Sequence, residues 1–193
     1  MIAHHVVFGV YGFWLPNDPR GSWSDFVGSW DLFRYGGKAT KTTEACSVAA
    51  VPHDQEQRLA TKRVLKRSPV RFNEQQILAV AEGFAEYSTR SGLVILACAI
   101  LPDHAHLVFI EHRLDAHRLV VQLKSAATRQ LTKSGLHPFQ RETTPPKCFA
   151  RGEWDVFLDT VEEVERAIQY VQLNPEKEGL PRQNWDFVTP YVR

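Results

Sequence analysis

The stretch "ILPDHAHLVF", residues 100–109, decides how the middle of the chain is interpreted. An apolar run ends at the turn signal "PD", and two histidines then alternate with apolar residues. Alternation of this kind is typical of a strand, so His104 and His106 would share one face and the residues between them the other. With the apolar run 93–101, the stretch predicts an antiparallel hairpin.

The segments on either side of this hairpin predict the remaining helices and strands of the fold. Asn73 is a suitable N-cap for the helical pattern that follows it, and Gly135 is a suitable stop for a second helix. Pro175 is expected to end the last helix. We expect strands at 4–14, 93–101, 104–111 and 148–159, and helices at 74–88, 115–135 and 161–173. This order predicts an α+β fold, a ferredoxin-like (split βαβ) antiparallel sheet with helices packed on it and an additional C-terminal helix.

A long segment follows the first strand, at about residues 15–72. It is punctuated by proline and glycine, and only 53–67 has a helical pattern. A structureless connection of this length is unusual in a compact domain, so the segment is interpreted as an insertion with its own packing. The prediction is a single domain, 1–193, that contains this insertion.

The bulk composition limits the possible functions. Net charge is +1 and the pI is about 7.8, so the whole chain has no basic signal for nucleic acid. Basic residues cluster locally at 61–71 and along 118–133, where they could be solvated helix faces or phosphate contacts. Three cysteines without metal or redox spacing favour a reduced, cytoplasmic chain. The longest apolar run, 93–101, is too short to span a membrane.

The two histidines can be interpreted in two ways. An isolated H-x-H pattern is common by accident, and a hydrogen-bonded pair at a strand end is the simpler interpretation. Two imidazoles on one face of a strand can also converge on a single ion. The last helix favours the second interpretation, because Tyr170 falls well away from its apolar stripe and Asn174 lies one turn further on the same side.

These motifs resemble those of a known family. "PDHAHLVF" resembles the HUH motif, histidine–apolar–histidine, of single-tyrosine transposases, which belong to the IS200-like superfamily. "YVQLNPEKEGL" resembles their tyrosine helix, most closely that of the REP-associated tyrosine transposases. The resemblance covers roughly residues 1–12 and 73–182, and the long insertion is larger than in minimal members. Ala105 departs from the bulky apolar residue that the family has between its histidines.

The resemblance implies a metal-dependent single-stranded DNA transesterase that cleaves and rejoins DNA near hairpins. Tyr170 would be the nucleophile and would form a 5′-phosphotyrosine intermediate with a free 3′-hydroxyl. His104, His106 and Asn174 would hold Mg²⁺ or Mn²⁺, the ions that the family uses. The ligand types alone would leave zinc or nickel open, because imidazole suits these ions as well. No sequence feature identifies a general base.

The resemblance also implies the partners. Single-stranded DNA and DNA hairpins, of the repetitive extragenic or transposon-end type, would be the substrates, with no membrane partner. We expect a monomer, with a dimer as the alternative, located in the cytoplasm and associated with the nucleoid when bound to DNA. The residues that we expect to contact DNA are Lys62, Arg63, Lys66, Arg67, Lys124 and Arg129.

Two other functions fit parts of the sequence. The first is a non-catalytic or domesticated DNA-hairpin-binding protein of the same fold, which would form no covalent adduct. The second is a two-histidine phosphoesterase acting on small nucleotides. That class needs two H-x-T/S motifs, whereas this chain has a single H-x-H followed by leucine.

Overall fold

The structure is a computed structural model that describes residues 3–42, 48 and 51–192. It divides into two compact units, one formed by Met1–Val10 with Arg71–Arg193 and the other by Tyr11–Val70. The single-domain assignment stays a prediction, and residues 43–47, 49 and 50 of the expected insertion lie outside the described residues.

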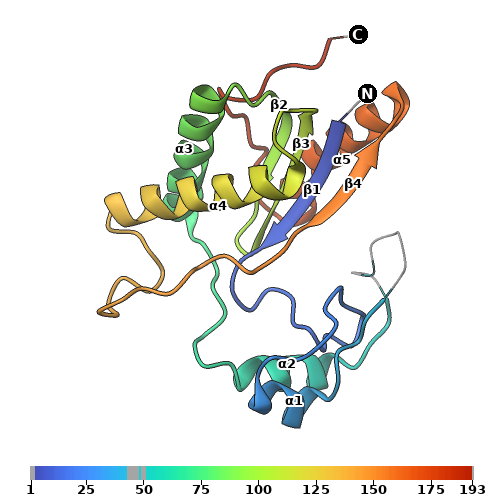
Figure 1. Ribbon diagram of the computed structural model, residues 1–193, viewed down its shortest axis with the longest axis vertical. Coiled ribbons are helices and arrows are strands. Elements are labelled where there is room, and N and C mark those ends of the chain that lie inside the picture. The colour runs from blue at the N-terminus through green and yellow to red at the C-terminus, as the bar shows by residue number, and fades with distance from the viewer. Residues whose placement is uncertain (1–2, 43–47, 49–50, 193) are drawn as a thin grey trace. The chain divides into compact units, whose positions relative to one another are not determined.

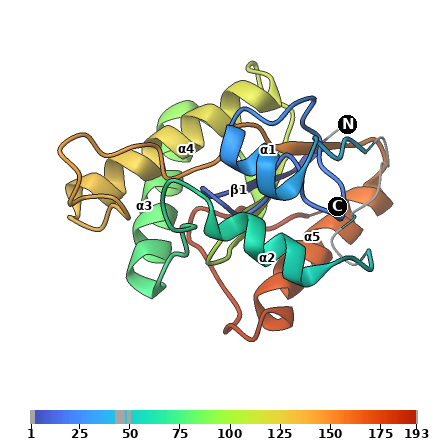
Figure 2. The same cartoon turned by 90° about the horizontal axis from the view of Figure 1, so that it is seen from below.

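The first unit is built on a four-stranded antiparallel sheet. Its strands lie in the order β2-β3-β1-β4, the order of a ferredoxin-like fold. Helices α3 and α4 cover one face of the sheet and α5 covers the other (Figures 1 and 2). The bounds are β1 Ala3–Gly9, α3 Glu74–Ser91, β2 Ile95–Ile100, β3 His104–Ile110, α4 Ala116–Lys133, β4 Trp154–Leu158 and α5 Val161–Lys177. The α+β fold class that the sequence predicts is confirmed.

The face under α3 and α4 is filled by aromatic and aliphatic side chains. Phe8 of β1 makes an edge contact with Phe84 of α3, and both rings are fully buried. Ala105 pairs with Phe8 in the β1–β3 register, so the small residue of the H-x-H motif lies beside a large one. Gly83 lets α3 approach α4 closely, because a Cβ there would lie 2.7 Å from the backbone of Ala127.

The opposite face packs against α5. Val108 of β3 and Ala97 and Ala99 of β2 form a buried cluster with Val164 and Val171 of α5. His5, His104 and His106 belong to this face as well, because β1 and β3 pair with Val7 opposite His106 and Gly9 opposite His104. The strand alternation predicted around the histidines therefore places them beneath the last helix.

Two features of the first unit differ from expectation. β1 and β4 are shorter than predicted: β1 ends at Gly9, and β4 covers only Trp154–Leu158. Pro175 does not end the last helix, which continues to Lys177. A proline in the final turn removes only its own N–H from the helical ladder, and Pro175 is itself buried against the unit. The later carbonyls are satisfied by the turn that follows, since Leu180 N–H donates to Pro175 O at 2.8 Å.

The second unit holds helices α1 (Trp30–Gly36) and α2 (Gln55–Arg63), which pack on one another. The sequence predicted only α2, because α1 is short and rich in aromatic residues with modest helix propensity. The loop before α1 is built around polar side chains. Arg20 forms a two-pronged ion pair with buried Asp18, with N–O distances of 2.8 and 2.9 Å, and its guanidinium lies 3.7 Å from the centre of the Trp14 ring.

None of the described helices is long and apolar enough to cross a membrane.

Candidate active site

The two histidines of β3 lie close together at the start of the strand. Their ring centroids are 4.9 Å apart. The carboxylate of Asp103, in the turn before β3, lies 2.7 Å from Nδ1 of His104. A carboxylate on one ring nitrogen fixes the ring and raises the basicity of the other, a common arrangement for metal-binding histidines. This contact makes Nε2 the nitrogen of His104 that would coordinate an ion.

His106 is almost fully buried and contacts a third histidine. Its Nδ1 lies 3.2 Å from Nε2 of His5, and the two rings stack with centroids 5.5 Å apart. Burial lowers the pKa of His5 to about 4. Burial, together with the charges of His104, His5 and Lys177, holds the pKa of His106 well below its usual range. Both rings are therefore neutral at pH 7, the form in which imidazole binds a metal ion.

His5 is a site residue that sequence reasoning did not identify. It belongs to β1, 101 positions from His106, and the strand pairing places it diagonally across from that residue. A histidine in a predicted first strand carries no local signal of this role. Only the antiparallel pairing of β1 with β3 brings it to the site.

Tyr170 lies on α5 above these histidines. Thr160 is the N-cap of this helix, and its side chain and that of Glu163 form a reciprocal capping box. The Tyr170 ring centroid is 5.7 Å from that of His106 and 5.8 Å from that of His5, both in edge contacts. The side chain is 42% exposed, so the phenol is held by the histidine rings but is accessible from solvent. The structure thus brings together three of the side chains identified from sequence: His104, His106 and Tyr170.

Asn174 and Lys177 follow Tyr170 on the same side of α5, at intervals of four and three residues. Asn174 is buried, and its Nδ2 has no hydrogen-bond partner in the part of the chain that the structure describes. Lys177 was not identified from sequence, because the helix was expected to end before it. Its Nζ lies 4.6 Å from the centre of the Tyr170 ring.

The side chains present suit a divalent cation. Two imidazoles lie side by side, and the buried amide can present its oxygen to an ion after rotation about χ2. Among the described residues, no three His, Cys, Asp or Glu side chains are gathered as metal ligands. The expected ligand set has only two such side chains and an amide, and it stays a prediction.

The six residues expected to contact DNA occupy different environments. Arg63, Lys66 and Arg129 are exposed. Lys62 donates to the carbonyl of Phe13 at 2.8 Å, and Arg67 is half-buried. Lys124 donates to the carbonyls of Ala150 and Gly152, and burial lowers its pKa to about 8. Lys124 therefore anchors the segment before β4, and a DNA contact for any of the six stays a prediction.

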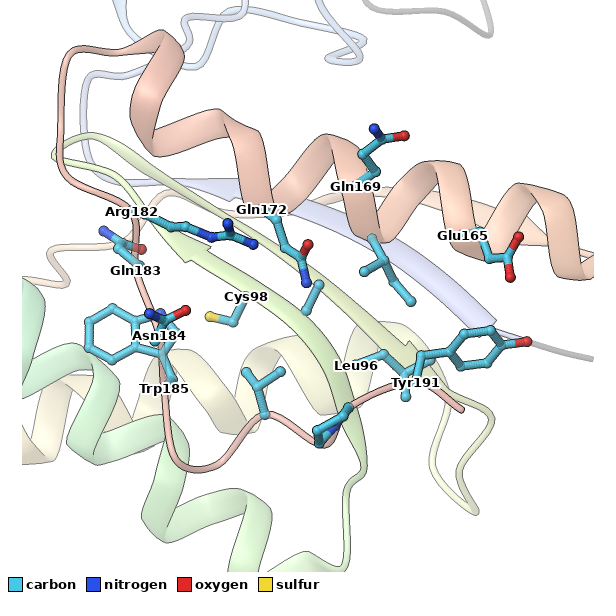
Figure 3. A pocket seen from close by; sticks show the side chains of 14 residues that line it. Leu96, Cys98, Glu165, Gln169, Gln172, Arg182, Gln183, Asn184, Trp185 and Tyr191 are labelled. Atoms are coloured by element: carbon cyan, nitrogen blue, oxygen red, sulfur yellow. The ribbon is translucent and has the colours of Figure 1, made fainter. Parts of the chain in front are cut away.

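A cavity of about 570 Å³ lies on another side of α5, between this helix, the edge strand β2 and the C-terminal segment 182–191 (Figure 3). Gln172 and Arg182 extend toward it, and Trp185 forms part of its wall. The candidate active-site residues are not among the side chains that line it. The site at Tyr170 is therefore open at the surface of α5 and is separate from this cavity.

Comparison with known proteins identifies the class. The family model described as "Transposase IS200 like" matches residues 61–174, more than half of the chain, including both β3 histidines, Tyr170 and Asn174. The chain therefore belongs to the IS200-like transposase family. This membership places it among the transposases, a class of proteins that act on DNA. A search of curated proteins gives no match.

Two solved structures are similar to this one. One is described as a REP-associated tyrosine transposase bound to a REP hairpin. It has 12% identity and a TM-score of 0.49, with 96% of this chain and 74% of that chain covered. The other, from Deinococcus radiodurans R1, is assigned as a transposase and has 13% identity and a TM-score of 0.44, with 94% and 92% covered. Both TM-scores are below 0.5, so the family assignment rests on the family model.

Proposed function

We propose that this protein is a metal-dependent transesterase of single-stranded DNA that uses Tyr170 as its nucleophile. The observation that carries the proposal is the edge contact of Tyr170 with buried, neutral His106, which lies beside His104. A tyrosine above a pair of imidazoles combines a nucleophile with ligands for a cation that would neutralise a phosphodiester.

The reaction requires little covalent chemistry from the protein. The Tyr170 hydroxyl oxygen would attack phosphorus and lose its proton, while the bond from phosphorus to the 3′ oxygen breaks. The 3′ oxygen takes up a proton, and the 5′ phosphate remains on the tyrosine. Attack by a second 3′-hydroxyl would reverse the step and join strands, with no net change in the number of phosphodiester bonds.

The protein's own side chains would position these groups. Asp103 would hold the His104 ring through Nδ1, and His5 would hold that of His106. His104, His106 and Asn174 would bind Mg²⁺ or Mn²⁺, which supplies charge neutralisation at the phosphate. The edge contacts with His5 and His106 would restrict the Tyr170 ring and so align its hydroxyl group.

The substrate of this proposed reaction is single-stranded DNA next to a hairpin. The resemblance of the tyrosine helix to that of the REP-associated branch supports this choice. Family membership supports DNA as the substrate in general.

Metal dependence provides the direct test of the function. Protein incubated with Mn²⁺ or Mg²⁺ and a labelled hairpin oligonucleotide with single-stranded flanks should give a covalent protein–DNA adduct on a denaturing gel. EDTA should abolish the adduct, and excess Mn²⁺ should restore it. Hairpin binding without an adduct under any metal condition would contradict the transesterase and favour a non-catalytic hairpin-binding protein.

Lys177 should contribute to the rate. Its ammonium group, 4.6 Å from the Tyr170 ring centre, can stabilise negative charge that develops on the phenol oxygen and the phosphate. We expect Lys177→Met to lower the initial rate of adduct formation by at least about tenfold. Lys177→Arg, which keeps the charge, should recover most of this loss.

Lys133→Met is the matched control, because Lys133 is an exposed lysine in the last turn of α4. This variant should react at the wild-type rate. Equal rates for Lys177→Met and Lys177→Arg would show that charge at this position has no part in the reaction.

A further inference from the structure

Residues 23–35, in the second unit, contain a concentration of aromatic side chains. Five of them are exposed, whereas only Phe157 and Tyr170 are comparably exposed elsewhere among the described residues. Exposed aromatic groups at this density on a folded unit commonly mark a binding surface. We call the following five residues the aromatic surface: Trp23 (54% exposed), Phe26 (74%), Trp30 (73%), Phe33 (39%) and Tyr35 (54%).

The helix that carries most of this surface is firmly held. Ser29 caps the N-terminus of α1, and Leu32 is buried beneath it. The Asn17 amide donates to the carbonyl of Leu32 at 2.7 Å and to that of Gly37 at 3.3 Å. Gly36 permits this contact, because a Cβ there would lie 2.3 Å from Asn17 Nδ2. The aromatic side chains are therefore presented from an ordered support, which limits the entropy lost on binding.

Two of these rings already form a stacked pair. Trp30 and Phe33 lie one helical turn apart, with centroids 5.7 Å apart and planes 19° from parallel. Trp30, which is 73% exposed, gives this pair a large aromatic surface that is open to solvent. Flat aromatic faces bind unpaired nucleobases of any sequence, because every base has a π-face.

The second unit, which carries the aromatic surface, has an excess of basic residues, and Asp25, one of the two acidic residues within 23–35, is paired with Lys41. Residues 11–70 contain nine Lys and Arg and six Asp and Glu, whereas the rest of the chain contains 14 and 16. Arg34 and Lys38 are exposed within and just after α1. Helix α2, which packs on α1, carries exposed Arg63 in its last turn. Aromatic groups interleaved with cations are the usual composition of single-strand-binding surfaces.

We propose that the aromatic surface binds single-stranded DNA by stacking on its unpaired bases, with nearby arginines and lysines contacting the phosphates. This inference rests on the proposed function, which supplies a single-stranded segment beside the hairpin. It adds a second contact region to that function, outside the histidine–tyrosine site. Binding there requires no chemistry at Tyr170.

The test compares strands with and without bases in protein that cannot cleave them. Full-length Tyr170→Phe protein would be titrated with an oligo-dT strand of about 12 nucleotides and with an abasic strand of the same length. We expect oligo-dT to bind at least about fivefold more tightly and to quench tryptophan fluorescence. Trp30→Ala with Phe33→Ala should bring the affinity ratio close to one, with affinity for the abasic strand retained.

Phe157→Ala is the matched control, because it removes an exposed aromatic ring from β4. It should leave the ratio unchanged, and circular dichroism should show that all variants are folded. An unchanged ratio in the Trp30/Phe33 variant, or equal binding of both strands by the parent protein, would overturn the inference. Concentration-dependent dimerisation that these substitutions abolish, with no change in the ratio, would also overturn it and would identify an interface between two copies.

These outcomes are independent of the cleavage reaction. If the Trp30→Ala/Phe33→Ala variant loses the base-dependent affinity while the wild-type protein forms no adduct, the proposed function is refuted and the inference about the aromatic surface stands. An adduct together with an unchanged ratio would do the reverse.

Discussion

Tyr170→Phe should abolish the covalent adduct and strand cleavage, with a loss on the order of 10⁴-fold or more. Phenylalanine keeps the ring that contacts His5 and His106 and removes only the hydroxyl group. Because the ring is 42% exposed, the substitution leaves no buried hydroxyl partner unsatisfied. The effect should therefore be on chemistry and not on folding.

The measurement is the initial rate of adduct formation with a labelled hairpin substrate, read on a denaturing gel. Hairpin affinity, measured by fluorescence anisotropy, should stay within about twofold of wild type, since we expect the hydroxyl group to act mainly in the transition state. Tyr191→Phe is the control, because it removes a phenol hydroxyl from the C-terminal segment and should react normally. An adduct from the Tyr170→Phe protein would show that another residue is the nucleophile.

His104→Ala should have the second-largest effect. It removes one of the two imidazoles proposed to bind the cation and leaves Asp103 without its ring partner. Loss of a hydrogen-bonding partner of a metal ligand commonly costs roughly 10- to 100-fold in affinity or activity, and loss of the ligand itself should cost more. We expect adduct formation to fall by at least about 100-fold, with partial recovery at high Mn²⁺ concentration.

His104 is a better choice than His106 for this experiment. His106 is 5% exposed and packs between His5 and Tyr170, so its removal would leave a cavity. His104 is the first residue of β3 and is only partly buried. His117→Ala is the matched control, since His117 is an exposed histidine of α4 that pairs with Glu153. Direct binding of Mn²⁺, followed by calorimetry, should weaken in His104→Ala and not in His117→Ala. Unchanged metal binding and cleavage in His104→Ala would contradict the metal site.

Much of the fold could be predicted because its signals are local. The Asn73 N-cap, the stop near Gly135 and the alternation after the "PD" turn each depend on residues within a few positions of one another. The order of elements then limits the topology to few alternatives, and the sheet order confirms the ferredoxin-like choice. The positions of Tyr170 and Asn174 on one side of α5 likewise follow from helical periodicity.

The prediction for the last helix was wrong at Pro175 for a physical reason. A proline disfavours a helical conformation of the residue before it, and the rule holds as a tendency. Here burial of Pro175 and the capping bonds of the following turn outweigh that local preference. Lys177 therefore lies on the helix beside Tyr170, and no rule based on neighbouring residues would have placed it there.

The amino-acid sequence was sufficient to predict the family, the order of the elements, and the two histidines, tyrosine and asparagine proposed as the active site. The other side chains at the site could be identified only from the three-dimensional fold. His5 reaches His106 through the pairing of β1 with β3, and Asp103 contacts His104 through the geometry of the turn. Periodicity reports contacts between residues near one another in the chain, whereas strand register and helix packing bring together residues about 100 positions apart. The contact of His5 with His106 is therefore one that no local pattern encodes.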